Sequence, residues 1–333
     1  MLEKTMRQVL TKKINEWVGS ITDREVQKSV QKDLIITGGC FTSMIQNEAP
    51  KDFDCYFRTK ETVLTVARYY IDLWNEEHKK QENAIDKFTK VFLLDGAKPD
   101  KEILEYYQVD SPDKSRSHMI SNITPDRVKI IFPSDGVVGN PEEVHSNEEL
   151  GTPEKVVGEL DEISADEILE SEKKRYFPVF MSSNAITLSN GIQVIVRFYG
   201  EPDKIHDTFD FIHTKAYWDN GKHEMCIPKD VYEHVVNKTL NYTGSKYPVC
   251  SIFRVRKFVQ RGWTINAGQL LKMCLQVSEL NLMDIDVLED QLIGVDSLYF
   301  MNLIQQFRAQ AEKDGKAFTL STSYVISIID KIF

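Results

Sequence analysis

The sequence predicts an α+β fold, a mixed β-sheet with flanking helices followed by a helical C-terminal region. Three observations carry this prediction. The first 80 residues alternate between helical and strand patterns, residues 178–218 are rich in β-forming runs, and the pattern beyond Pro228 is helical. For the first 80 residues taken alone, an α/β unit is the alternative.

Helical patterns open the chain and follow its first strands. Residues 1–32 are predicted to form two helices, the second of them capped by Thr22 or Asp23, whose side chains can accept from the first amides. Residues 59–80 place apolar side chains at helical spacing, with acids early and lysines late, as the helix dipole favours.

Two short strands are expected between these helices. The run LIIT at 34–37 predicts a buried strand, and Gly38-Gly39 predicts a turn into a short helix that Pro50 limits. The run DFDCYF at 52–57 alternates polar and apolar residues, which is typical of a strand.

Beyond residue 176 the patterns are again clear. Asn190-Gly191 lies between two β-rich runs and predicts a hairpin with a type I′ turn. Residues 205–218 alternate like a further strand, and four helices are expected after Pro228, at 229–242, 248–262, 265–280 and 295–315. We therefore predict a domain over 1–227 with a large insertion at about 80–175, and a helical domain over 228–333.

Composition restricts the class of protein. Of 333 residues, 41% are hydrophobic and 28% are charged, and no run approaches the roughly 20 apolar residues that span a bilayer. We expect a cytoplasmic protein without membrane contact. The five cysteines are scattered without a C-x-x-C pair, which predicts neither disulfides nor a zinc site.

The net charge of −10 conceals two opposite regions. Residues 142–172 carry twelve acids and one base, or −11, which leaves the rest of the chain near +1. This segment, within an acidic stretch of about 135–175, is interpreted as a solvated, flexible loop, or alternatively as a cover for a basic surface. Residues 234–278 carry seven Lys and Arg and no acid. An acidic protein can thus present a local basic surface.

Asp52 and Asp54 are the first candidates for chemistry. In a strand their side chains leave one face with Cα atoms about 6.5–7 Å apart. Two carboxylates that close repel unless a cation neutralises them, and Mg²⁺ prefers carboxylate and phosphate oxygens. A two-metal site needs a third carboxylate, for which Asp210 in TFDFIH is the candidate. The sequence therefore predicts three metal-binding and catalytic carboxylates and two Mg²⁺ ions.

The glycine pair upstream suggests an anion site. Gly38 and Gly39 allow close approach of a phosphate to the backbone, and the amides of the following helix, with the hydroxyls of Thr42 and Ser43, can bind it. Plain helix capping is the alternative for the two hydroxyls. His206 and His213 are interpreted as surface residues.

Taken together, IITGG, DFDC and FDF resemble the nucleotidyltransferase superfamily of DNA polymerase β, poly(A) polymerases and CCA-adding enzymes. The stretch YPVCSIFRVRKFVQRGWTI at 247–265 is similar to a helix of the CCA-adding and poly(A) polymerase branch. The resemblance implies that Arg254 and Lys257 face the nucleotide. The strings SNAITLS and HDTFDF also look like a group of phage-borne proteins, which would place the chain in a host cytoplasm.

The function implied by the resemblance is transfer of NMP from an NTP, such as ATP, to a hydroxyl, with an RNA or tRNA-like 3′ end as acceptor. Asp52 and Asp54 would hold both metals, and Asp210 one metal and the attacking hydroxyl. Basic and aromatic residues suit a single-stranded nucleic acid. The candidates for that contact are Lys246, Arg256, Arg261 and Trp263.

Two alternatives stay open at this point. One is a nucleotidyltransferase with a protein or small-molecule acceptor. The other is a catalytically silent protein that binds nucleic acid or serves in structure or interaction. The sequence indicates neither the NTP nor the oligomeric state.

Overall fold

The computed structural model describes residues 1–78, 91–99, 124–132, 137–139 and 176–292, together with Phe307, Ser323 and Ile326. The acidic segment at 142–172 and most of the helix expected at 295–315 lie outside these residues.

The chain divides into two compact units. The first, called the sheet unit here, contains Met1–Glu105, Ile123–Asp207 and Thr214–Pro228. The second, the helical unit, contains Tyr106–Asn122, Thr208–His213 and Lys229–Phe333. A short segment around Asp210 therefore belongs to the helical unit although the chain on both sides of it belongs to the sheet unit. The domain prediction, with its catalytic and nucleic-acid-binding roles, stays a prediction.

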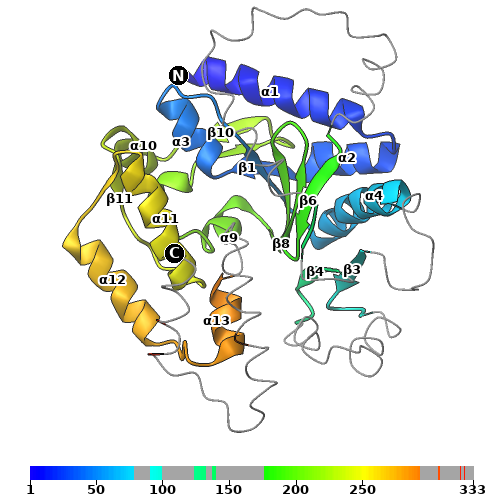
Figure 1. The fold of residues 1–333 in the computed structure, drawn as a ribbon. Coiled ribbons are helices and arrows are strands. Elements are labelled where there is room, and N and C mark those ends of the chain that lie inside the picture. The colour runs from blue at the N-terminus through cyan, green and yellow to red at the C-terminus, as the bar shows by residue number, and fades with distance from the viewer. Residues whose placement is uncertain are drawn as a thin grey trace, which may run out of the picture. The chain divides into compact units, whose positions relative to one another are not determined.

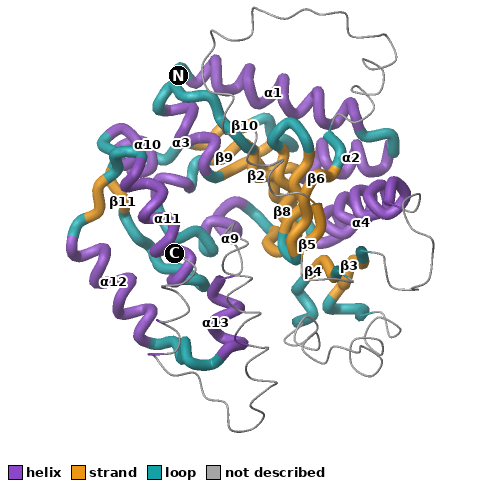
Figure 2. The backbone as a smooth tube through the Cα atoms, in the orientation of Figure 1, coloured by secondary structure: helices purple, strands orange, loops and turns teal. Residues whose placement is uncertain are grey.

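A mixed eight-stranded sheet forms the centre of the sheet unit (Figures 1 and 2). β2 and β8 are parallel, whereas the other neighbouring pairs are antiparallel. The prediction of an α+β fold with a mixed sheet is confirmed. In spatial order the strands are β10 (Glu224–Cys226), β9 (Tyr217–Asp219), β1 (Leu34–Thr37), β2 (Phe53–Phe57), β8 (Ile192–Tyr199), β7 (Ala185–Leu188), β6 (Pro178–Ser182) and β5 (Val137–Gly139).

The predicted hairpin joins β7 to β8. Asn190 and Gly191 have φ angles of 64° and 71°, the positive values that a type I′ turn requires at both central residues. A Cβ at position 191 would lie 2.5 Å from the carbonyl oxygen of Lys51, so only glycine fits there without a shift. The Asn-Gly prediction is confirmed, and the turn also holds the chain that enters β2, because the amide of Phe53 donates to the Gly191 carbonyl.

The first four helices of the sheet unit follow the predicted patterns, whereas α9 was not predicted. Asp23 rather than Thr22 caps the second helix, accepting from the amides of Glu25 and Val26. The helix bounds are α1 (Glu3–Ser20), α2 (Arg24–Asp33), α3 (Gly39–Ile45), α4 (Lys60–His78) and α9 (Pro202–His206). A separate antiparallel pair consists of β3 (Phe92–Asp95) and β4 (Val128–Ile131).

The core of the sheet unit lies between the sheet and its helices. α4 packs on β2, β6 and β8, while α2 packs on α4 and β1, and α1 on α2 (Figure 1). Trp17 of α1 is fully buried, and its indole donates to the hydroxyl of Tyr70 of α4 at 2.7 Å. This bond satisfies both polar groups inside an otherwise apolar core.

The helical unit begins after Pro228. Its elements are α10 (Lys229–Val236), β11 (Thr239–Leu240), α11 (Pro248–Gln260), β12 (Thr264–Ile265), α12 (Ala267–Ser278) and α13 (Ile285–Leu292). α11 packs on α12 and α13, and β11 pairs with β12 in parallel. The helix expected at 229–242 ends earlier, at Val236, because Lys238 adopts a positive φ of 48° and the chain enters β11.

The strand expected over residues 205–218 does not form. α9 ends at His206, a 3₁₀ turn (η4) covers Ile212–Thr214, and only β9 remains extended. Among the described helices, none has the length and apolar character needed to cross a membrane.

Candidate functional site

The glycine pair and the two aspartates meet at one corner of the sheet unit. β1 ends at Thr37, which is paired across the sheet with Asp54 of β2. Gly38 then turns the chain with a φ of 97°, and α3 starts at Gly39. We call Thr37, Gly38, Asp52 and Asp54 the Gly38 corner. The sequence correctly predicted this turn, and the structure explains it by the neighbouring aspartate.

Gly38 is required at this corner for two reasons. Its φ lies in the region that side chains disfavour, and a Cβ there would lie 2.6 Å from Oδ2 of Asp54. Gly39 has an ordinary φ and open space around it. The pair of glycines thus contains one position that tolerates no side chain and one that does.

We expect Gly38→Ala to lower the free energy of unfolding by about 1–3 kcal/mol, because the added methyl is strained and displaces Asp54. Gly39→Ala is the matched control and should leave stability unchanged or slightly raise it, since alanine is the better helix former. Urea denaturation of both variants measures the difference. Equal stability of the two variants would contradict this account of the corner.

Both carboxylates of the corner act on one buried thiol. The pKa of Cys40, in α3, is raised well above its ordinary value, first by burial and then by the negative charges of Asp54 and Asp52. The pKa of Cys55 in β2 is also raised, first by burial and then by the negative charge of Asp54. Both thiols are buried, and the raised pKa keeps them protonated.

A histidine that the sequence analysis placed at the surface lies against the corner instead. The Thr37 hydroxyl donates to the carbonyl of Ala216 at 2.7 Å, so its oxygen accepts from Nε2 of His206 at 2.8 Å. This arrangement selects the tautomer that carries its proton on Nε2. Burial, followed by the charge of Lys215, lowers the pKa of His206 to about 4. The interpretation of His206 as a surface residue was wrong.

The predicted phosphate contacts of α3 have different environments. Thr42 is buried, whereas Ser43 is half-buried. α3 has only seven residues, which gives a weak dipole at its N-terminus. The proposed roles of both hydroxyls stay predictions.

Asp210 belongs to the helical unit and has a partner there. It is 6% exposed, and its Oδ2 lies 2.6 Å from Nη1 of Arg254 in α11. Its carbonyl accepts from the amide of Thr243. Within the part of the chain that the structure describes, no group of three or more His, Cys, Asp or Glu is placed to hold a metal ion. Within the helical unit Asp210 neutralises Arg254, and its role as the third carboxylate stays a prediction.

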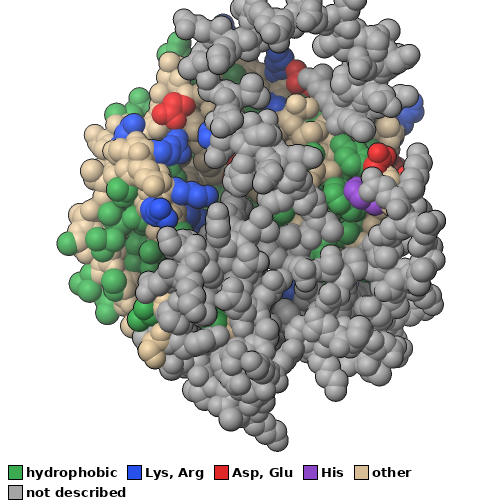
Figure 3. Space-filling view, in the orientation of Figure 1, with side chains coloured by type: hydrophobic (Ala, Val, Ile, Leu, Met, Phe, Trp, Pro, Cys, Tyr) green, Lys and Arg blue, Asp and Glu red, His purple; other side chains and the backbone are tan. Residues whose placement is uncertain are grey.

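The residues predicted to contact the nucleotide or nucleic acid differ in their exposure. Lys246, Arg256, Lys257 and Arg261 are exposed, and Figure 3 shows Lys and Arg side chains over the surface where α11 runs. Trp263, in contrast, is buried, with its ring 4.5 Å from that of His213 and 5.2 Å from that of Phe258. The prediction that Trp263 stacks on a base is wrong, because its ring fills the core of the helical unit.

His213 lies in the same aromatic cluster. It is fully buried, and burial, with the charges of His234 and Arg261, lowers its pKa to about 3. The surface interpretation was wrong here too. A buried neutral imidazole within an aromatic core points to a packing role.

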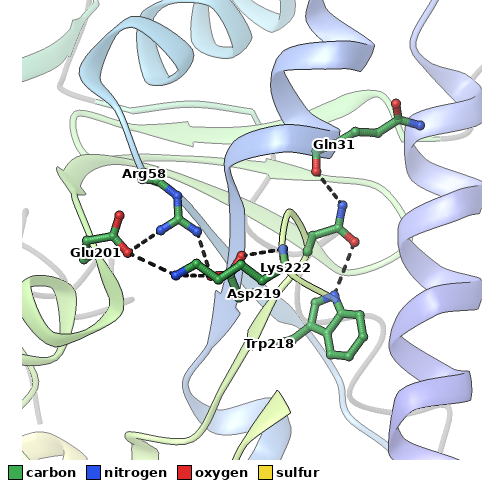
Figure 4. A network of polar contacts seen from close by, with 7 residues as sticks. Gln31, Arg58, Glu201, Trp218, Asp219 and Lys222 are labelled. Atoms are coloured by element: carbon green, nitrogen blue, oxygen red, sulfur yellow. Dashed lines mark hydrogen bonds and ion pairs between the residues drawn. The ribbon is translucent and has the colours of Figure 1, made fainter. Parts of the chain in front are cut away.

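An ion-pair cluster of the sheet unit was missed by the sequence analysis. Arg58, just after β2, contacts Glu201 and lies 2.6 Å from Oδ2 of Asp219, which is 1% exposed (Figure 4). Lys222 also pairs with Asp219, at 3.3 Å. Burial raises the pKa of Asp219, but the hydrogen bonds from Arg58 and Lys222 outweigh it and hold the pKa below its ordinary value. Only tertiary structure brings these residues together.

The ion-pair cluster borders an open cleft of about 710 Å³ between α1, α2 and the turn after β9. Next to it, the Asn220 side chain donates to the Gln31 carbonyl and accepts from the Trp218 indole (Figure 4). These hydrogen bonds attach the turn after β9 to α2. Together with the ion-pair cluster they hold this side of the sheet in place.

The fold and the Gly38 corner define a class: an α+β protein with a mixed eight-stranded sheet and a separate helical unit. Within that class, the chain belongs to the Gabija anti-defense 2 family, whose model matches residues 8–238. This range contains every strand of the eight-stranded sheet. The chain is also similar to the protein named Gabija anti-defense 2 of Bacillus phage SPbetaL7, with 23% identity over 119 residues. The match covers 35% of this chain and 29% of the phage protein.

These findings correct the implied function. The resemblance to the nucleotidyltransferase superfamily is overturned by the family match, and the transfer of NMP to RNA or another acceptor falls with it. The description of the chain as a nucleotide-, ATP-, tRNA- and metal-binding protein rested on the same resemblance and loses its support, whereas the roles of the individual site residues stay predictions. The Gly-Gly and Asp-x-Asp spacing has a local explanation, a tight turn packed against Asp54. Whether the chain catalyses any reaction, and whether Mg²⁺ binds, stay predictions.

Proposed function

We propose that this chain is an anti-defence protein of a phage that counteracts the Gabija defence system in the cytoplasm of its bacterial host. The single observation that carries the proposal is the family match over residues 8–238. Its length matters, because it extends from α1 to the end of α10 and so covers a complete folded sheet rather than a short motif. The similarity to a phage protein supports the same origin.

We further propose that it acts by binding a protein of the Gabija system. Nine of the ten large apolar side chains that are exposed among the described residues lie in the helical unit, namely Tyr232, Val236, Ile252, Val259, Leu270, Leu271, Leu275, Met283 and Ile326. Exposed apolar side chains that gather in one region are typical of protein interaction surfaces. NTP and RNA are not needed as partners under this proposal.

Expression of the chain in bacteria that carry the Gabija system should restore plating of a Gabija-sensitive phage to the efficiency seen in cells without the system. The physical reason is that a bound inhibitor removes the active defence protein by mass action. Plaque counts on the two strains, with and without the chain, measure the effect. Unchanged restriction at confirmed expression of folded protein would contradict the proposal.

The Gly38 corner supplies a control for this experiment. Asp54→Asn removes one charge beside Cys40 but keeps the shape of the side chain. If binding alone inhibits the defence, the variant protects as well as the natural chain. Loss of protection by a folded Asp54→Asn variant would instead point to chemistry at the Gly38 corner.

A further inference from the structure

α12 presents its apolar side chains outward. At about 100° per residue, positions 267, 270, 271, 274 and 275 share one side of a helix. Leu270, Leu271 and Leu275 on that side are 44%, 59% and 59% exposed, and Cys274 is exposed as well. Figure 3 shows hydrophobic side chains gathered over the region of α12. We call these four residues the leucine face.

The opposite side of α12 is held by polar contacts within the helical unit. Oε1 of Gln269 accepts from the amide of Tyr242. Gln276 accepts from the Tyr242 hydroxyl and the Ser245 amide and donates to the Ser245 carbonyl. Met273 is the one buried apolar residue of the helix. An amphipathic helix normally buries its apolar side. In α12 the hydrogen bonds hold the polar side against the helical unit, and the apolar side is exposed.

Charge around the leucine face indicates the chemistry of its occupant. The segment 234–278, which contains α11 and α12, carries seven cations and no acid. Lys272 lies beside Leu271 in sequence and, with Leu275, Gln276 and the acid Glu279, lines an open cavity of about 570 Å³ formed with residues 241–244. A complementary occupant is therefore apolar in its centre and acidic at its rim.

Two other occupants fit less well. A second copy docked face to face would place the cations of both chains against one another, which is unfavourable. Single-stranded nucleic acid would need exposed rings beside the leucine face for stacking, but Tyr242, which lines the neighbouring cavity, is buried.

We propose that the leucine face of α12 is the docking surface for an acidic, apolar-centred segment of a partner protein. The inference rests on the proposed function, under which that partner is a protein of the Gabija system.

The test uses the full chain and each purified protein of the Gabija system. The double variant Leu271→Ser/Leu275→Ser should weaken binding at least about tenfold, as expected for central apolar contacts, and abolish protection in the plating assay. Lys272→Glu should weaken binding and reduce its dependence on salt. Leu2→Ser is the matched control, since Leu2 is 79% exposed and lies in the sheet unit, and it should bind normally.

The outcomes separate the two proposals. Protection by the natural chain together with full binding by the double variant overturns the docking surface and leaves the proposed function intact. Failure of the natural chain to protect overturns the proposed function itself. A lower melting temperature of the isolated double variant than of the natural chain would show that another part of the same chain covers the leucine face. A lower mass of the double variant than of the natural chain, measured by light scattering, would show that a second copy covers it. Either result overturns this inference.

Discussion

Arg58→Ala should lower the free energy of unfolding of the sheet unit by about 3–5 kcal/mol, because it leaves the carboxylate of Asp219 buried without its closest partner. Lys222 still contacts Asp219 at 3.3 Å, but its side chain is more than half exposed and compensates only weakly. The expected loss is therefore nearer the lower end of this range. Urea denaturation followed by circular dichroism measures it.

Two further variants make this prediction specific. Glu201→Ala removes the exposed partner of the same guanidinium and should cost less than about 1 kcal/mol, as surface ion pairs do. Arg58→Ala combined with Asp219→Asn should recover part of the loss, because the buried charge is gone. If Arg58→Ala and Glu201→Ala lowered the free energy of unfolding equally, burial of Asp219 would not be the cause of the effect of Arg58→Ala.

Acidification from pH 7.5 to pH 5.0 should cost about 2 kcal/mol of unfolding free energy for each of the two buried histidines. The folded pKa is about 4 for His206 and about 3 for His213, whereas an unfolded histidine titrates near 6.5. Below about pH 6.5 each of these histidines binds a proton in the unfolded chain but stays neutral in the folded chain, so the free energy of unfolding falls as the pH falls. The loss levels off only as the pH passes through the folded pKa.

The two histidines can be separated because they lie in different units. His206→Gln keeps a donor toward Thr37, and His213→Phe keeps a ring in the aromatic cluster. Each variant should remove about half of the pH-dependent loss, measured as urea denaturation at the two pH values. A variant that keeps the full pH dependence would show that its histidine is protonated in the folded state.

Local sequence determined the secondary structure well where a single stretch contains the whole signal. Asn190-Gly191 specifies its turn because few residues other than Asn and Gly accept positive φ, and Asp23 specifies a helix start because its carboxylate bonds the first amides. The alternation of residues 205–218 misled for the same reason: a period of two records burial of alternate side chains, and says nothing about whether both sides face one sheet.

At the candidate functional site, too, some features follow from local sequence and others from tertiary contacts. By itself the sequence determined the tight turn at Gly38, its approach to an acidic strand and the acid-free segment 234–278, because glycine, spacing and charge are properties of the chain alone. Only the tertiary structure decided that Asp210 pairs with Arg254, that His206 and His213 are buried, and that α12 turns its leucines outward. These outcomes depend on contacts between residues far apart in the chain, and no local pattern records which partner a charge or an apolar face finds.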